Sequence, residues 1–273
     1  MNSEFENIAT EIMIQVGTEK EEALRCLYYE PKNEIKQTIV LIPGFFSLPS
    51  AWDELLINAK EDYRIFLIET REKHTAKINK KSDFSLERFA NDIAEVIDYL
   101  MLKDYILVTS SMGGAFTLTA MKESLIHPKH SFLVGPVLRV EIPDWSWPLV
   151  RITTPFFYRF ILKPSIKLYV RRKFERDQAE KYCVSLDNLE IRRVKKTMLT
   201  LKKFRITAED LNVINSHCVL IGAEKDKLHQ SQITKWIHEQ IPNSDYVDLG
   251  SNVVAHGIPL LELIEKTIEK DNN

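Results

Sequence analysis

The stretch VTSSMGGAF places two serines beside a pair of glycines, where an apolar run ends and a helical pattern begins. A serine held at such a tight strand-to-helix turn can act as a nucleophile, provided that the residues two positions before and after it are small. For Ser110 these neighbours are Val108 and Met112, and both would clash. For Ser111 they are Thr109 and Gly113, which can fit. Ser111 is therefore the candidate nucleophile, and the alternative is a serine that only caps an ordinary helix.

A serine hydroxyl is a weak nucleophile and needs a base. Of the seven histidines, six lie in or beside charged and polar stretches, where a surface position is the default. His256 differs, because it follows the last apolar run and precedes a helical pattern. The stretch CVLIGAEKDKL offers Glu224 and Asp226 just after a strand end, and a carboxylate can orient such a base. The alternatives are a turn histidine beside a flexible glycine and a solvated charged loop.

The elements that would position these groups are short apolar runs alternating with amphipathic stretches. Strands are predicted at residues 38–42, 63–68, 105–110, 130–135, 218–222 and 246–250, after an antiparallel hairpin of residues 11–16 and 23–29. Helices are predicted at residues 86–102, 113–122, 231–240 and 259–270, the first of them capped by Ser85. This alternation predicts an α/β fold, a mostly parallel central sheet flanked by helices.

The alternation of predicted strands and helices ends after Pro136, where the sequence becomes helical, basic and aromatic. We expect residues 137–215 to form a helical cap inserted into a core made of residues 1–136 and 216–273. Residues 139–205 hold 17 Lys/Arg and 7 Asp/Glu, a balance of 17 − 7 = +10. Because the whole chain carries −2, the remainder carries −2 − 10 = −12. A basic block in an acidic body suggests a module with its own surface role.

The chain order Ser111, Asp226, His256 resembles that of the α/β-hydrolase superfamily, in particular serine esterases of the monoacylglycerol-lipase kind with a helical cap. The family's elbow reads G-x-S-x-G, and Thr109 stands here in place of the first glycine. The resemblance implies that His256 is the base and that Asp226, which completes a G-x-x-x-D pattern, orients it. Glu224 is the reserve. The resemblance covers about residues 38–134 and 218–270.

The resemblance also implies an oxyanion hole made of two backbone N–H groups. The first belongs to Met112, which follows the nucleophile. The second belongs to Phe45 in LIPGFFSLPSAWDEL, which is similar to the family's H-G-x segment, with Pro43 where histidine is usual. The alternative for this segment is an apolar loop that closes over the core.

The segment ETREKHTAK looks like the family's D-x-R-G turn. Glu69 and Arg71 are retained in kind, and the glycine is lost. We expect these two side chains to form structural ion pairs and to take no part in catalysis.

Aromatic residues alternate with arginine and lysine in the expected cap. We predict that Trp145, Trp147, Phe156 and Phe157 contact the substrate, which favours an apolar acyl group. The same mixture suits the interface of an anionic membrane, or an anionic substrate such as an acyl-CoA or a lysophospholipid. The alternative is a purely structural role, in which an amphipathic helix pair packs its apolar face on the core. No nucleic-acid recognition motif is found, so no nucleic-acid partner is expected.

The expected reaction is hydrolysis of a carboxylic ester or thioester through an acyl-enzyme, with no metal and no organic cofactor. One alternative is a non-catalytic hydrolase-fold module that binds a lipid or a protein. Others are an acyltransferase and an enzyme that uses the same triad for carbon–carbon or cyanohydrin cleavage.

The expected location is the cytoplasm. The N-terminus MNSEFENIATEI lacks the basic start and apolar core of a signal peptide. No uncharged apolar run approaches the ~20 residues that a spanning helix needs. Cys26, Cys183 and Cys218 are scattered and odd in number, which argues against a disulfide framework. Peripheral contact with an anionic membrane remains an open alternative.

Overall fold

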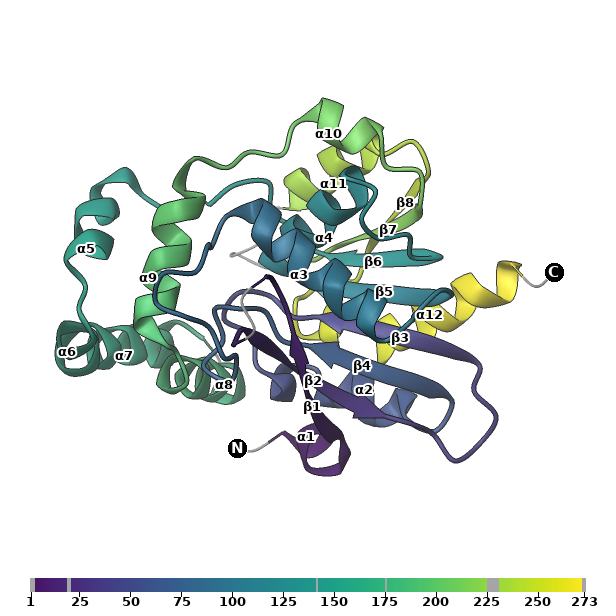
Figure 1. Cartoon of the computed structure of the whole chain (residues 1–273), viewed down its shortest axis with the longest axis horizontal. Helices are drawn as coiled ribbons and strands as arrows, with labels where there is room; N and C mark the ends of the chain where they lie inside the picture. Colours follow the sequence, from purple (N-terminus) through teal and green to yellow (C-terminus); the bar gives the residue numbers. More distant parts are fainter. Residues whose placement is uncertain (1–2, 19–20, 141, 175, 225–230, 272–273) are drawn as a thin grey trace.

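The central element is an eight-stranded sheet, seen in a computed structural model that describes residues 3–18, 21–140, 142–174, 176–224 and 231–271. The strand order is β1-β2-β4-β3-β5-β6-β7-β8 (Figure 1). The strands are β1 Thr10–Gln15, β2 Ala23–Tyr29, β3 Gln37–Ile42, β4 Tyr63–Ile68, β5 Tyr105–Ser110, β6 His130–Val134, β7 His217–Gly222 and β8 Ser244–Asp248. The pairs β1–β2 and β2–β4 are antiparallel, and all the others are parallel. The predicted fold class and its opening hairpin are confirmed.

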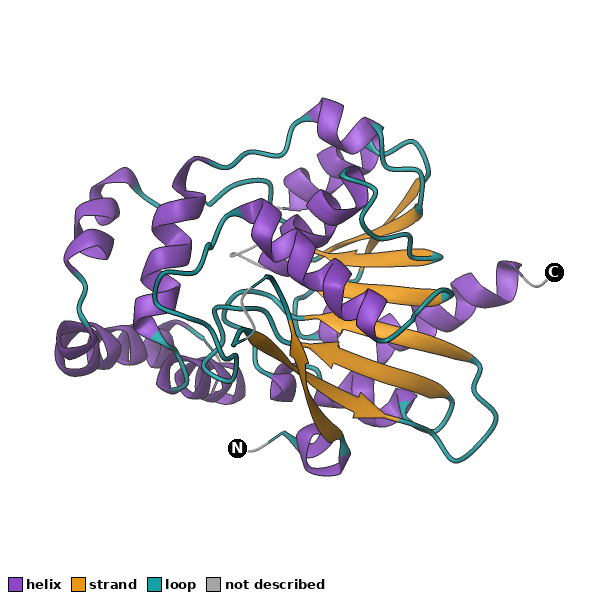
Figure 2. Ribbon diagram, viewed as in Figure 1, coloured by secondary structure: helices purple, strands orange, loops and turns teal. Residues whose placement is uncertain are grey.

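Helices cover both faces of this sheet (Figure 2). One face packs against α1 Glu4–Ile8, α2 Asp53–Ala59 and α12 Ile258–Asp271. The other packs against α3 Leu86–Tyr99, α4 Met112–Lys122, α10 Ala208–Asn212 and α11 Ser231–Gln240. The inner parallel strands β3, β4 and β5 are apolar and buried along most of their length because helices lie on both sides of them.

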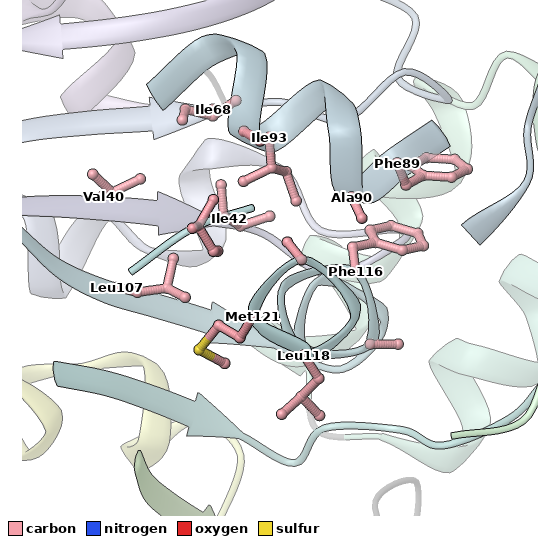
Figure 3. Packing of buried hydrophobic residues seen from close by; sticks show 14 of the residues in the cluster. Val40, Ile42, Ile68, Phe89, Ala90, Ile93, Leu107, Phe116, Leu118 and Met121 are labelled. Atoms are coloured by element: carbon pink, nitrogen blue, oxygen red, sulfur yellow. The ribbon is translucent and has the colours of Figure 1, made fainter. Parts of the chain in front are cut away.

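The contact between α3 and α4 illustrates how the sequence builds this core. The Ser85 hydroxyl accepts a hydrogen bond from the backbone N–H of Arg88 and so caps α3, as predicted. The rings of Phe89 and Phe116 stack between the two helices with centroids 4.1 Å apart (Figure 3). The packing holds α4, and therefore its first turn, firmly against the carboxyl end of β5.

A second group of helices lies between β6 and β7 in the chain. It comprises α5 Trp147–Ile152, α6 Pro155–Phe157, α7 Lys163–Lys173, α8 Arg176–Asp187 and α9 Ile191–Thr200, with the short turns η2 Asp144–Ser146, η3 Tyr158–Leu162 and η4 Leu201–Lys203. Two more short turns, η1 Pro49–Ala51 and η5 Val254–His256, lie in the loops before α2 and α12. The group α5–α9 lies beyond the carboxyl ends of the parallel strands (Figure 1). By contrast, α10 packs against α4 and α11 on the body of the sheet.

In the described part of the chain, no helix combines the length and the apolar character needed to cross a membrane.

Candidate active site

Ser111 occupies a strained turn between β5 and α4. Its backbone has φ 49° and ψ −120°, a conformation that residues with a Cβ rarely adopt. The turn is held by two backbone hydrogen bonds, from Ser111 N–H to the Val134 carbonyl and from Gly114 N–H to the Ser111 carbonyl, each 3.0 Å long. Such a turn presents a serine hydroxyl at the end of a buried sheet.

Glycines allow the elements around this turn to approach closely. A Cβ at Gly113 would lie 2.7 Å from both the Ile42 carbonyl oxygen and Thr109 Oγ1. Thr109 is fully buried, and among the described residues its hydroxyl has no hydrogen-bond partner. Thr109 is accommodated because position 113 has no side chain. A Cβ at Gly114 would lie 2.7 Å from Pro136 Cβ, so α4 also packs tightly on the segment after β6.

His256 lies in η5, between β8 and α12. Its Nδ1 is 2.7 Å from the carbonyl oxygen of Asn252. A carbonyl can only accept a hydrogen bond, so Nδ1 carries the proton and Nε2 is the basic nitrogen of the neutral ring. The ring also packs on Trp52, with centroids 4.2 Å apart. Two contacts therefore fix both the tautomer and the orientation of this imidazole.

The predicted acid, Asp226, lies outside the described residues. The reserve candidate, Glu224, is exposed, and its Oε1 accepts a hydrogen bond from Lys235 Nζ at 2.7 Å. The described partner of His256 Nδ1 is the Asn252 backbone carbonyl, a contact that no sequence pattern predicted.

The loop after β3 runs directly against the serine turn. A Cβ at Gly44 would lie 3.2 Å from the Ser110 carbonyl oxygen and 3.3 Å from Ser111 Cβ, so only a glycine fits without displacement. The next residue, Phe45, and the first residue of α4, Met112, both line the cavity beside Ser111. The two predicted oxyanion donors thus belong to segments that meet at this serine.

A buried lysine that sequence reasoning missed holds this loop. Lys73 Nζ donates to the carbonyl oxygens of Gly44 and Phe45, each at 2.7 Å, and lies 3.1 Å from Glu72 Oε1. Lys73 is only 6% exposed. The same Glu72 oxygen accepts a hydrogen bond from the Thr70 hydroxyl at 2.8 Å. The absence of a histidine at position 43 was the sequence signal that some other group must fix the loop.

The two charged residues of the turn after β4 form buried ion pairs. Arg25 Nε donates to Glu69 at 2.7 Å, and Arg71 Nη2 donates to Asp92 of α3 at 2.8 Å. Arg71 is completely buried and also donates to the Asp83 carbonyl oxygen at 2.6 Å. These contacts anchor the segment that carries Lys73.

A cavity of about 1030 Å³ lies beside the candidate catalytic residues. Ser111, His256, Phe45 and Met112 all line it. Much of its remaining wall is apolar and comes from the segment after β6 and from α8, α9 and η4, including Val137, Leu138, Ile142, Val184, Met198 and Leu201. The cavity therefore lies between the carboxyl edge of the sheet and the helices beyond it.

The four aromatic residues predicted to contact substrate are placed elsewhere. None of them is among the described residues that line the cavity. Trp147 is buried, with Lys202 Nζ 4.7 Å from its ring centre. Trp145 and Phe156 are exposed, and Phe157 is half-buried. The cavity-lining residues of α8 and α9 are less aromatic, and the sequence did not mark them because their positions depend on how the helices fold back over the sheet.

Solved structures of several hydrolases share this architecture. An esterase from Thermogutta terrifontis superposes with a TM-score of 0.76 at 13% identity, covering 96% of this chain and 98% of that one. An enol-lactonase from Burkholderia xenovorans gives 0.73 at 14% identity, covering 93% and 98%. Naproxen esterase (carboxylesterase NP) from Bacillus subtilis gives 0.68 at 12% identity, covering 97% and 92%. At these identities the likeness concerns the fold.

Two sequence matches extend this likeness. The chain is 22% identical over 246 residues to the uncharacterized hydrolase YugF of Bacillus subtilis, covering 85% of this chain and 88% of that protein. The model of the alpha/beta hydrolase family matches residues 39–259, which include the serine turn, η5 and the helices between β6 and β7. The expected family is confirmed: the chain belongs to the alpha/beta hydrolase family.

Proposed function

We propose that the protein is a serine hydrolase that cleaves a carboxylic ester, or a thioester, with an apolar acyl group. The observation that carries this proposal is the strained turn at Ser111, which opens into the same cavity as His256. Membership in the alpha/beta hydrolase family supports a hydrolase in general. The ester specificity and the roles of individual residues are our inference.

In the proposed mechanism, the Ser111 oxygen attacks the carbonyl carbon of the ester. Nε2 of His256 takes the hydroxyl proton and then delivers it to the leaving oxygen or sulfur. Water attacks the resulting acyl-enzyme and gives up its proton to the same nitrogen. His256 then returns this proton to the Ser111 oxygen as the bond to the acyl group breaks and the acid leaves. The hydrogen bond from Nδ1 to the Asn252 carbonyl supports this assignment, because it keeps Nε2 as the basic nitrogen.

We assign the orienting carboxylate to Asp226, with Glu224 in reserve. The positive charge that develops on His256 needs a counter-charge, which the Asn252 carbonyl dipole supplies only in part. The position of Asp226 after β7, four residues beyond Gly222, suits this role by the order of elements along the chain.

The oxyanion would be stabilised by the backbone N–H groups of Phe45 and Met112. The close approach of Gly44 to Ser111 supports this assignment. The two hydrogen bonds from Lys73 to the Gly44 and Phe45 carbonyls make Lys73 a positioning residue for the first donor.

The apolar wall favours a substrate with a hydrocarbon acyl chain. Leu138, Ile142 and Val184 would contact that chain, whereas Lys181 and Arg205, which also line the cavity, could bind an anionic leaving group. We propose that residues 137–215 act as a cap, that the enzyme works in the cytoplasm, and that its substrate is a small ester or lipid.

A panel of p-nitrophenyl esters, from acetate to decanoate, tests this function. We expect hydrolysis that becomes faster as the acyl chain lengthens, because each buried methylene contributes about 0.8 kcal/mol. The activity should disappear in Ser111→Ala. Inactivity of the folded protein across the panel and on matching thioesters would contradict the proposal.

A further inference from the structure

Large apolar side chains are exposed along the consecutive elements η2, α5, α6, η3 and α7. We call the exposed part of residues 145–173 the outer cap surface. Scattered exposed apolar residues are ordinary, but such a concentration in one segment marks an interaction site. Trp145 is 76% exposed and Phe156 is 70% exposed. The other apolar members of the outer cap surface include Ile152, Phe160, Leu168 and Tyr169.

The same segment is strongly and uniformly basic. Residues 145–173 contain no Asp or Glu, and their seven basic residues are Arg151, Arg159, Lys163, Lys167, Arg171, Arg172 and Lys173. Lys163 and Lys167 bind Asp187 of α8, at 3.0 and 2.5 Å. The five others are exposed. The Arg159 guanidinium lies 5.6 Å from the centre of the Phe160 ring, so an exposed cation and an exposed apolar ring lie side by side in this segment.

The mixture of residues decides which partner fits. A second copy of the chain in a two-fold contact would bring the same cations face to face, which is unfavourable. A nucleic acid would accept the cations and stack on the rings, but it offers nothing apolar to Ile152 and Leu168. A bilayer with anionic headgroups accepts aromatic, aliphatic and basic side chains together. Aromatic rings and aliphatic groups enter the interface, while arginines bind the phosphate of the headgroups.

The location of the surface agrees with this partner. The helices α5–α7 form the end of the molecule opposite the C-terminus, beyond the sheet (Figure 1). They are attached to α8 by Lys167–Asp187 and by the Tyr158 hydroxyl, which donates to the Leu186 carbonyl at 2.6 Å. Since α8 lines the cavity, a membrane held by α5–α7 would lie on the cap side of the molecule.

We propose that the outer cap surface docks the protein on an anionic phospholipid membrane, with Trp145, Phe156 and Phe160 entering the interface. This binding does not depend on the proposed hydrolysis, so Ser111→Ala should bind membranes as the parent protein does. A failure of membrane binding and a failure of catalysis are therefore separate results.

Sedimentation with phosphatidylcholine vesicles, with and without phosphatidylglycerol, tests the proposal. We expect binding to the anionic vesicles that weakens about tenfold or more in Phe156→Ser/Phe160→Ser. Replacing Arg159 by Gln should weaken it about fivefold. The matched control is Tyr99→Ser, because Tyr99 is 63% exposed and ends α3 at the opposite, amino edge of the parallel strands.

Equal binding to both kinds of vesicle, no binding to either, or an unchanged double variant would overturn the proposal. Self-association that the double variant abolishes, without vesicle binding, would identify a protein contact instead.

Tryptophan fluorescence separates insertion from simple adsorption. Of the four tryptophans, Trp52 and Trp147 are buried, and Trp236 is 37% exposed on α11, away from the cap helices. Trp145 is 76% exposed and belongs to the outer cap surface. Lipids with brominated acyl chains should quench the parent protein, and Trp145→Phe should lose most of that quenching. Vesicle binding without quenching that depends on Trp145 would mean that another surface makes the contact, and would contradict the proposal.

Discussion

At Ser111 the backbone is held in a conformation that costs of order 1–3 kcal/mol, and the surrounding contacts must sustain it. Gly113 and Gly114 supply the space, and the Val134 carbonyl accepts the serine N–H. The sequence pointed to this serine through the size of its neighbours, and the observed close contacts around Gly113 explain why size is the criterion.

Lys73 gives the first test at the residue scale. Replacing it with Met removes the ammonium from the Gly44 and Phe45 carbonyls and leaves the buried Glu72 without that partner. The loop should then hold the Phe45 N–H less firmly. We expect kcat to fall about 10–100-fold with little change in KM, less than the loss of a whole donor.

The control is Lys77→Met, an exposed lysine of the same segment. A merely structural role for Lys73 would lower the unfolding temperature and leave kcat of the folded protein unchanged.

Whether a carboxylate orients His256, as we propose for Asp226, is the second question at the residue scale. If Asp226 orients the ring, Asp226→Asn should lower kcat by about 10³–10⁴-fold. Glu224→Gln is the matched control, since Glu224 instead binds Lys235. A loss of only a few-fold in Asp226→Asn would mean that the Asn252 carbonyl orients His256 unaided.

At the scale of elements, buried strands were the most predictable part. The runs at 63–68 and 105–110 coincide with β4 and β5, because strands covered on both faces are continuously apolar. The helices α1 and α2 were not predicted. The first turn of α1 depends on Asp53, which is distant in sequence and accepts hydrogen bonds from the N–H groups of Glu4 and Phe5 at 3.0 and 3.1 Å. Local sequence cannot reveal such a partner.

The same limit explains why Lys73 was missed. A lysine within ETREKHTAK reads as a solvated charge, and its burial depends on the loops after β3 and β4 meeting. The residues of α8 and α9 that line the cavity were not predicted either, because their positions also depend on contacts between segments that are distant in sequence. The prediction of substrate contact rested on aromatic residues such as Trp145 and Phe156, which are exposed in the structure.

The ion pair between Arg71 and Asp92 tests how the turn after β4 is anchored to α3. Asp92→Ala leaves a fully buried guanidinium with poorer partners, so we expect the free energy of unfolding to fall by about 3–5 kcal/mol in urea titrations. Arg71→Met/Asp92→Leu should lose much less than the sum of the two single substitutions. Additive losses would contradict a direct coupling.

On the scale of the whole molecule, the proposed hydrolysis requires two parts of the structure to meet. The sheet supplies Ser111 and the loops beside it, and the helices after β6 supply much of the cavity wall. Val184→Trp in α8 should therefore fill part of the cavity. We expect the preference for octanoate over acetate to fall at least about tenfold, since several methylenes would lose their contacts.

Leu168→Trp on the exposed side of α7 is the control for this change. An unchanged chain-length preference in Val184→Trp would mean that the acyl chain does not occupy the space beneath α8.

The most direct test of the catalytic claim is mass spectrometry of the intact protein after reaction with a fluorophosphonate. We predict one adduct per chain, mapped to Ser111, lost in Ser111→Ala, greatly slowed in His256→Ala and retained in Ser110→Ala. A folded protein that stays unlabelled, or that carries its adduct on another residue, would contradict the account.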